Sequence, residues 1–421
     1  MKIEKPKNDN YCANVIEIKN IIPLTNCDNV IATSIFGFQA IVGKDTKIGD
    51  IGIAFTAETQ LSDDYCFNNN LYRHDDKNFT KGIKGYIEDN RRVKAIKFRG
   101  NTSNCLFMPL ESLRFTKIDT SLLSVGDSFD ILNGVEICKK YEVAHNPMKQ
   151  QFQGKKFSRV ESIHMPEHID TSNFFKYSDT IAPDKDIIVT QKIHGTSIRI
   201  GNTIVKRKLS IFEKIADKLG IKVQKTEHDY IFGSRKVIKD ANNPDQNHFY
   251  ESDIWSLEGK KLVGLLPENY LVYGELIGFT PDGKEIQKNY TYNIERNFCE
   301  LYVYRVAVIN AQGYIVDLTF DQMKEFCNKN GLKVVPEVWR GKMKDFVATD
   351  WIDKRFFECG NKQCLYLGKN DLVDEGVVIR VDGLQPYFLK AKSPIFLEHE
   401  TKLLDTGAED LESSQNNETT V

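Results

Sequence analysis

The chain lacks any apolar run close to the roughly 20 residues that a membrane-spanning helix needs. Four of its first seven residues are charged, and they contain no apolar stretch of the kind that forms a secretory signal. No internal repeat is present. We therefore expect a soluble cytoplasmic protein with no membrane partner, and its 421 residues are enough for two or three domains.

A complete set of metal-ligating residues is also missing. The nine cysteines are an odd number, and only Cys359 and Cys364 lie close together in sequence. No second cysteine pair or histidine cluster completes a zinc site with them. The composition therefore favours ordinary reduced cysteines over structural zinc or disulfides.

The chain has no excess of positive charge, since its formal net charge is −2. The charges are unevenly distributed along the chain, because residues 205–225 hold seven Lys or Arg side chains against two carboxylates. Local clusters of this kind are typical of nucleic-acid contacts. A solvated edge strand and a solvated helix face are the alternatives. The candidate contacts are Arg91, Arg92, Lys94, Lys97, Arg99, Lys206, Arg207 and Lys208.

The first third of the chain consists of short β-like runs separated by Gly, Asn and Asp. This spacing predicts a small Greek-key barrel, for which an OB fold is the best candidate. The runs are residues 31–36, 38–42, 51–55, 92–98 and 105–108. The predicted domains are an OB-like nucleic-acid-binding module at 1–138, a linker at 139–165, a catalytic domain at 166–405 and a disordered acidic tail at 406–421.

The second part of the chain mixes helical and strand periodicities. Apolar spacing predicts helices at 211–219, 249–265 and 320–330. Two strands, 377–382 and 386–392, are expected to be joined by a turn around Gly383. These patterns predict an α+β domain.

One lysine follows an apolar run as though a strand delivered it to a site. Residues 186–190 lead into Lys192, His194 and Gly195. Alone, this pattern also fits a surface lysine before a glycine turn. Further polar residues follow in or after β-like runs, as expected if several strands direct them into one cleft. These residues are Arg235, Glu275, Glu375, Lys390 and Lys392.

This ordered set resembles the covalent nucleotidyltransferase superfamily of DNA ligases, RNA ligases and capping guanylyltransferases, over about residues 181–395. Histidine two positions after Lys192 is the form of the RNA ligase branch typified by phage RNA ligase 2. The resemblance implies a ligase (ATP-grasp-like) catalytic domain of antiparallel sheets with flanking helices, preceded by the OB-like barrel. It also implies an ATP-dependent RNA ligase that uses Mg²⁺ or Mn²⁺ in RNA repair.

The implied reaction joins a 3′-OH RNA end to a 5′-phosphate end through a lysyl-AMP enzyme and an adenylylated 5′ end. Lys192 would be the nucleophile. A lysine has an ordinary pKa near 10.4 and must lose its proton to attack, so the cations Arg235, Lys390 and Lys392 would help by disfavouring a further positive charge. A nicked or bridged duplex of RNA, or of RNA with DNA, is the expected substrate.

The resemblance also assigns the other site residues. Glu275 would bind the ribose and Glu375 metal-bound water, and both are candidate metal ligands. Tyr304 would stack on the adenine, with Tyr302 as the alternative. Many relatives have a glutamate where Thr190 stands. The remaining nucleotide contacts would be Thr190, Gln191, His194, Gly195, Arg235, Lys390 and Lys392, with a hydroxyl from Thr196 or Ser197.

Two other functions remain open. A capping guanylyltransferase shares the lysine chemistry but carries a further domain after the last lysine motif, whereas only about thirty residues follow Lys392. A nucleic-acid-binding relative without activity would be expected to have lost some of the six motif residues, which are Lys192, Arg235, Glu275, Glu375, Lys390 and Lys392. Their joint presence favours an active RNA ligase.

Overall fold

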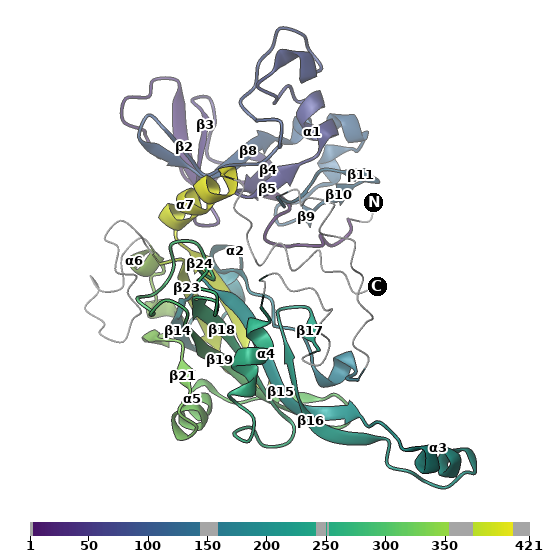
Figure 1. Ribbon diagram of the computed structural model, residues 1–421. Coiled ribbons are helices and arrows are strands. Elements are labelled where there is room, and N and C mark those ends of the chain that lie inside the picture. The colour runs from purple at the N-terminus through teal and green to yellow at the C-terminus, as the bar shows by residue number, and fades with distance from the viewer. Residues whose placement is uncertain (1–2, 144–158, 241–249, 251, 353–373, 407–421) are drawn as a thin grey trace. The chain divides into compact units, whose positions relative to one another are not determined.

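The computed structural model describes residues 3–143, 159–240, 250, 252–352 and 374–406. Two compact units are present (Figure 1). Within the described residues, the first comprises 3–143, 172–180 and 391–406, and the second 159–171, 181–240, 250, 252–352 and 374–390. Most of the predicted linker, almost all of the predicted tail, and Cys359 and Cys364 lie outside the described residues. No helix in the described ranges is long and apolar enough to cross a bilayer.

The first unit is mainly β-structure around a sheet in the order β2-β3-β8-β4-β1-β9. Among the described strands, β2 and β9 are the edges of this sheet, so the ladder is open and the OB-type barrel is not confirmed. Apolar side chains such as Val15, Phe55 and Phe129 form its core. The sheet strands are β1 (Ala13–Glu17), β2 (Val30–Ile35), β3 (Phe38–Gly43), β4 (Ile51–Thr56), β8 (Cys105–Pro109) and β9 (Ser128–Phe129).

Shorter elements complete this unit. The strand pairs are β5 (Thr59–Leu61) with β12 (Cys138–Lys140), β6 (Ile96–Phe98) with β7 (Asn101–Ser103), and β10 (Ile131–Leu132) with β11 (Val135–Glu136). The helices are α1 (Asp63–Asn68), α2 (Phe174–Tyr177) and α7 (Pro394–Asp405), and β13 (Ser172–Asn173) precedes α2. Of the strand predicted at 92–98, only the last three residues form a strand, which is β6.

Arg92 is a core residue of the first unit and is only 1% exposed. Its guanidinium donates to Glu58 at 3.3 Å and to the Thr401 carbonyl at 3.1 Å, and it also pairs with Asp405 on α7. Burial raises the pKa of Glu58 to about 7, although the charge of Arg92 opposes this rise. The prediction that Arg92 contacts nucleic acid is therefore wrong, because a buried and paired guanidinium does not reach a phosphate.

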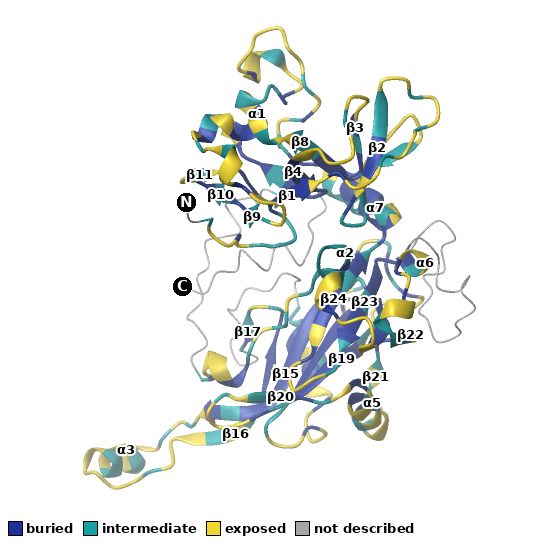
Figure 2. Ribbon diagram, turned by 180° about the vertical axis from the view of Figure 1, so that it is seen from behind, coloured by how far each residue is buried: buried dark blue, intermediate teal, exposed yellow. Residues whose placement is uncertain are grey.

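The described part of the second unit contains two mainly antiparallel sheets. In one, the strands follow the order β24-β23-β14-β22, and in the other β17-β16-β15-β18-β19-β20, with β21 parallel to β19. Figure 2 shows that the central strands of these sheets are largely buried, among them β14, β15, β18 and β23. The bounds of the strands are β14 (Asp186–Lys192), β15 (Thr196–Lys206), β16 (Thr226–Gly233), β17 (Ile238–Lys239), β18 (Tyr270–Gly278), β19 (Cys299–Ile309), β20 (Ile315–Asp317), β21 (Lys333–Val334), β22 (Glu337–Lys342), β23 (Gly376–Val381) and β24 (Tyr387–Lys392).

The helices of the second unit are short, and α3, α4 and α5 begin with a side-chain cap. Ser210 and Thr319 each form a capping box, which satisfies free backbone N–H groups at the start of α3 and α5. The predicted helix at 320–330 is confirmed, whereas the one at 249–265 is described only as the short α4. The helices are α3 (Ile211–Lys218), α4 (Ile254–Lys260), α5 (Phe320–Lys329) and α6 (Thr349–Ile352). The α+β prediction is confirmed.

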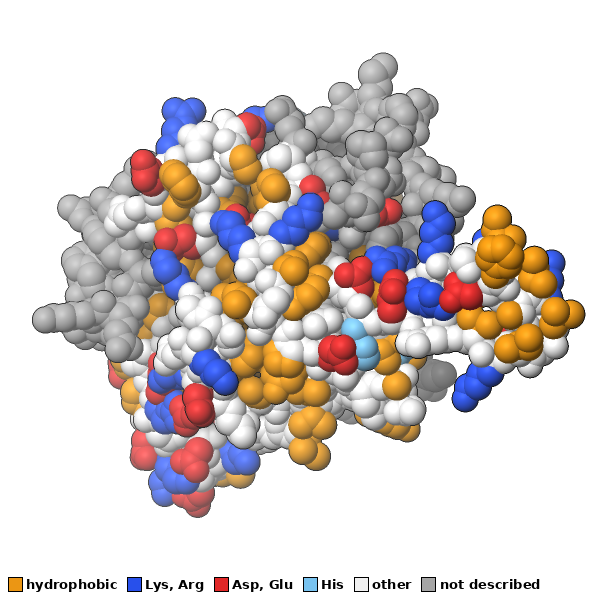
Figure 3. Space-filling view, turned by 60° about the horizontal axis from the view of Figure 1, so that its bottom comes forward, with side chains coloured by type: hydrophobic (Ala, Val, Ile, Leu, Met, Phe, Trp, Pro, Cys, Tyr) orange, Lys and Arg blue, Asp and Glu red, His pale blue; other side chains and the backbone are white. Residues whose placement is uncertain are grey.

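Helix α3 lies at the far end of the ladder that β15 and β16 form (Figure 1). The last pair of this ladder is Lys206 with Thr226, so residues 207–225 make up the tip beyond it. Figure 3 shows hydrophobic side chains gathered at the end of this projection.

Candidate active site

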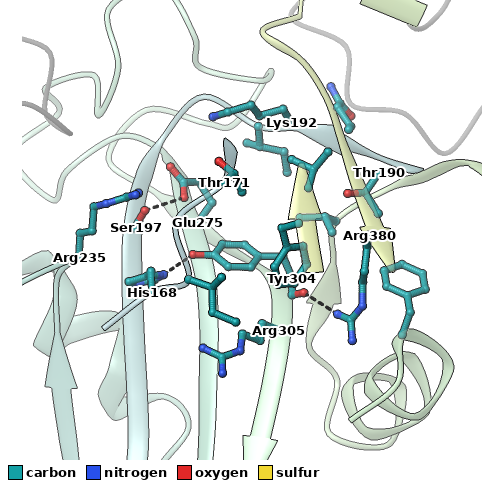
Figure 4. Close-up of a pocket in the computed structure, with 17 residues that line it drawn as sticks. His168, Thr171, Thr190, Lys192, Ser197, Arg235, Glu275, Tyr304, Arg305 and Arg380 are labelled. Carbon is teal, nitrogen blue, oxygen red and sulfur yellow. Dashed lines mark hydrogen bonds between the residues drawn. The ribbon is translucent and has the colours of Figure 1, made fainter. Parts of the chain in front are cut away.

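A cavity lies between the two sheets of the second unit (Figure 4). Its walls come from β14, β23 and β24 on one side and from β15, β18 and β19 on the other. Polar and charged side chains therefore converge from strands far apart in sequence. The lining residues are His168, Ile169, Thr171, Thr190, Gln191, Lys192, Ile193, Ser197, Arg235, Glu275, Tyr304, Arg305, Phe320, Val335, Val378, Arg380 and Phe388.

Lys192 is the last residue of β14 and lines the cavity. Its Nζ donates a hydrogen bond of 2.8 Å to Oε2 of Glu375, whose side chain is 4% exposed. Strand pairing explains this contact, because Lys192 is opposite Gly376 in the β14–β23 ladder and Glu375 directly precedes that glycine. Nδ1 of His194 lies 3.7 Å from the same carboxylate oxygen. The structure thus gathers three residues of the predicted site.

Gly195 permits a close approach to β18. A Cβ atom at this position would lie 2.2 Å from the carbonyl oxygen of Leu276 and 2.9 Å from Cγ of Glu275. The neighbouring backbone is held by side chains, since Gln287 donates to the Gly195 carbonyl at 2.9 Å and the His194 N–H donates to the Tyr292 hydroxyl at 2.7 Å. Glycine is therefore required here for packing, whereas its predicted contact with the nucleotide stays a prediction.

Ser197 and Glu275 face each other on paired strands, and both line the cavity. The Ser197 hydroxyl donates to Oε2 of Glu275 at 3.2 Å. Glu275 is 8% exposed, so this acceptor is held in place next to the cavity. Arg235 enters from the loop after β16, and its guanidinium donates to Oδ1 of Asp170 at 2.6 Å.

Tyr304 occupies a β-bulge in β19. The β18–β19 register passes from Tyr273 opposite Arg305 to Gly274 opposite Val303, so Tyr304 is the extra residue of the bulge. The bulge allows both Tyr304 and Arg305 to line the cavity, and Tyr302 is not among the lining residues. Of the two aromatic residues considered from the sequence, the structure therefore brings Tyr304 to the site.

Two polar side chains fix Tyr304. Its hydroxyl is hydrogen-bonded to Nδ1 of His168, and its carbonyl oxygen accepts from Nη1 of Arg380 at 3.1 Å. Arg380 is 2% exposed and also donates to the Leu318 carbonyl at 2.7 Å and to Asp382 at 2.6 Å. Figure 4 shows Tyr304 between His168 and Arg380. Arg380 therefore ties the bulge of one sheet to β23 of the other.

The remaining predicted nucleotide contacts divide into two groups. Thr190 and Gln191 line the cavity, and the Gln191 amide donates to Asp374. Lys390 and Lys392 are not lining residues, although Phe388, two positions before Lys390 on β24, is one. Lys392 belongs to the first unit, where its Nζ pairs with Glu400 at 3.3 Å.

Comparison with known proteins agrees with this geometry. Residues 185–392 match the family model for RNA ligase. These residues belong to the RNA ligase family. The prediction of an RNA ligase enzyme is thus confirmed at the level of the family. No curated protein matches the sequence.

Solved structures show the same fold over nearly the whole chain. The structure of Naegleria gruberi RNA ligase with PPi has a TM-score of 0.59 and 17% identity, and the match covers 93% of this chain and 98% of that chain. A mutant of the same ligase with ATP and Mn has a TM-score of 0.57 and 16% identity, with 93% and 98% coverage. The similarity thus extends beyond the RNA ligase domain to the first unit.

Sequence reasoning did not find several residues of the RNA ligase cavity, including His168, Thr171, Arg305 and Arg380. His168 and Thr171 lie before residues 185–392, the part of the chain that matches the family model. Arg380 follows Glu375 in a β-like run, and a buried cation in a strand was the signal that could have identified it. Arg305 pairs with buried Asp317 at 2.5 Å.

Most of the predicted nucleic-acid contacts hold acidic partners. In the first unit, Lys94 pairs with Asp405 at 2.8 Å, Lys97 with Glu398 at 3.3 Å and Arg91 with Asp63 at 3.5 Å, while Arg99 donates to the carbonyl of Asn26 at 3.1 Å. In the RNA ligase domain, Lys206 lies 3.6 Å from Glu161 and Arg207 pairs with Glu213. Lys208 has no acidic partner among the described residues. Apart from Arg92, contact of these residues with RNA stays a prediction.

Proposed function

We propose that this chain is an ATP-dependent RNA ligase whose nucleophile is Lys192. Its Nζ would attack the α-phosphorus of ATP, which forms the P–N bond of lysyl-AMP and breaks the bond to the pyrophosphate leaving group. AMP then passes to a 5′-phosphate end, and a 3′-hydroxyl displaces it to form the phosphodiester. The observation that carries this proposal is the position of Lys192 at the cavity, in contact with the buried carboxylate of Glu375.

The cavity fits a nucleoside triphosphate in its chemistry. Tyr304 offers an aromatic ring, and Ser197 with Glu275 offers polar groups suited to ribose hydroxyls. Arg235 offers a guanidinium, which matches phosphate oxygens as a two-pronged donor. Its present partner Asp170 is largely exposed, so a phosphate can replace that carboxylate at little cost. The structure of a Naegleria gruberi ligase mutant with ATP and Mn agrees with this substrate.

The carboxylates also fit a divalent cation bound together with substrate phosphates. No cluster of three or more metal-ligating side chains occurs in the described part of the chain. Mg²⁺ usually keeps several waters and binds one or two carboxylates plus phosphates, so a full protein cage is not required. Glu375 is the carboxylate nearest to Lys192, with Glu275 as the second candidate. Such a cation would neutralise charge on the reacting phosphate.

An RNA joining assay tests the proposal. Labelled 5′-phosphate RNA and 3′-hydroxyl RNA are supplied as a nicked duplex and as free single strands, with ATP and Mg²⁺. We expect joining with ATP that is faster on the nicked duplex, and none in Lys192→Ala. The control variant Lys329→Ala changes an exposed lysine on α5 and should retain activity.

Three outcomes would contradict the proposal. Equal joining of free strands and nicks would remove the duplex preference. Transfer of GMP from GTP to RNA would indicate a capping guanylyltransferase. RNA binding without either reaction, and with the same strength in the wild type and in Lys192→Ala, would indicate an inactive relative.

A further inference from the structure

The tip at residues 207–225 is a folded structure in its own right. Helix α3 has a capping box in which the Ser210 hydroxyl accepts from the Glu213 N–H and the Glu213 carboxylate accepts from the Ser210 N–H. The helix has no buried residue, and Figures 1 and 2 both show it beyond the end of the β15–β16 ladder. Local capping therefore forms a helix that no packing against the rest of the unit explains.

The apolar side chains of the tip are exposed together. They are between 51% and 84% exposed, and Phe212 is the most exposed. At about 100° per residue, the four that begin with the first helical residue fall within an arc of about 100° on one side of the helix. A contiguous exposed patch of this kind marks an interaction site. The residues are Ile211, Phe212, Ile215 and Leu219, followed by Ile221.

The charges around this patch are positive. Both carboxylates of the tip are neutralised, because Glu213 pairs with Arg207 and Asp217 pairs with Lys225 at 2.8 Å. Within the described ranges, the structure shows no acidic partner for four further lysines. Two of them lie on the helix directly beside the apolar arc. The four are Lys208, Lys214, Lys218 and Lys222.

The composition of the tip distinguishes between possible occupants. Protein interfaces favour Tyr, Trp, Phe, Met and Arg and are depleted of Lys. Residues 211–222 contain only Phe212 from the favoured types and hold three lysines. RNA recognition uses polar and aromatic side chains and would leave the aliphatic ones in water. A second copy of the chain would bring two sets of lysines together. A negatively charged lipid surface accepts both the apolar side chains and the lysines.

We propose that the tip docks on an anionic lipid bilayer. Phe212, Ile215 and Leu219 enter the boundary between headgroups and acyl chains, while the neighbouring lysines contact lipid phosphates. This inference does not depend on the proposed ligase reaction, and it reverses the expectation from the sequence that the protein has no membrane partner.

Vesicle flotation of the full-length protein tests the inference. Vesicles of phosphatidylcholine alone are compared with vesicles that contain about one-third phosphatidylserine. We expect binding at least about tenfold stronger to the anionic vesicles, and a loss of about tenfold or more in the double variant F212S/I215S. The matched control Leu384→Ser changes an equally exposed leucine outside the tip and should bind as wild type.

A second pair of variants and an unfolding measurement separate the possible failures. K214E/K218E should also lose binding to anionic vesicles. F212S/I215S should unfold in urea at the same midpoint as the wild type, which shows that the protein is folded and that only docking is affected. The inference is overturned if the wild type does not bind anionic vesicles, if F212S/I215S binds as wild type, or if that variant loses RNA binding while vesicle binding persists.

Discussion

The ammonium group of Lys192 lies 2.8 Å from the carboxylate of Glu375, although 183 residues separate the two in sequence. The β14–β23 ladder creates this contact by placing Lys192 opposite Gly376. In the proposed reaction, Lys192 must leave this ion pair before it can attack. A cation bound to Glu375 would compete for the same carboxylate, which would link metal binding to release of the nucleophile.

The first prediction concerns Glu375. Glu375→Gln keeps the size of the side chain and removes its charge, so we expect lysyl-AMP formation to slow by about 10²–10³-fold at saturating ATP. The measurement is the initial rate of protein labelling as Mg²⁺ is varied. Glu325→Gln, an exposed change on α5, serves as the control. A rate for Glu375→Gln within threefold of wild type would contradict the role of this carboxylate.

The second prediction concerns Arg380, which we regard as a positioning residue. Arg380→Met removes the donors to Tyr304, Leu318 and Asp382, so the bulge that presents the Tyr304 ring should loosen. We expect the KM for ATP to rise about tenfold or more, with a smaller fall in kcat. Arg380→Lys should restore only part of the effect, because an ammonium cannot reproduce the guanidinium fork. An unchanged KM in a folded Arg380→Met protein would refute this role.

Much of the active site was predictable because its residues lie at positions that strand geometry brings together. Lys192 ends β14, while Glu275 and Tyr304 lie on adjacent strands of the other sheet. Of the polar residues expected in one cleft, Lys192, Arg235 and Glu275 line the cavity, whereas Lys390 and Lys392 do not. The α+β class also followed from the periodicity of the apolar residues.

Other features depend on contacts that a sequence pattern does not contain. The choice of Tyr304 over Tyr302 rests on a β-bulge, and the position of Arg380 on two backbone carbonyl groups. Arg92 looks like a surface cation in sequence because its partners on α7 lie more than 300 residues away. Because it pairs with residues distant in sequence, Arg92 is a core residue and not the RNA contact that was predicted.

The third prediction concerns Gly195. In Gly195→Ala, the new methyl group would meet the Leu276 carbonyl and force β15 and β18 apart, so we expect a loss of about 1–3 kcal/mol in unfolding free energy together with slower adenylylation. Gly43→Ala is the matched control, since a Cβ there meets no atom within 4 Å. Urea unfolding of both variants provides the comparison. Equal unfolding free energies for the two variants would show that β18 can move to accommodate the methyl group at no cost in stability.

The fourth prediction concerns Glu58 and pH. Burial raises the pKa of its carboxyl from about 4.5 to about 7 on folding, so the folded protein binds this proton more tightly than the unfolded chain. The resulting stabilisation is complete below about pH 4.5 and is lost as the pH rises through 7. We expect the unfolding free energy to fall by at most about 3 kcal/mol over this range through this group.

Urea unfolding between pH 5 and 8 measures this effect. Glu58→Gln should flatten the slope of unfolding free energy against pH, even though loss of a partner for Arg92 lowers its overall value. The exposed change Glu111→Gln should leave the slope unchanged. A slope in Glu58→Gln equal to that of the wild type would show that Glu58 does not take up the proton.

The most direct test of the central claim is covalent labelling of the protein by ATP that carries the label at the α-phosphate. With Mg²⁺, we predict label that remains on the wild-type protein after denaturation, and that is lost if the native protein is first treated with pyrophosphate. The label should be absent from Lys192→Ala but present in Lys329→Ala. Label from GTP in place of ATP, label that persists in Lys192→Ala, or no label from either nucleotide would contradict the account.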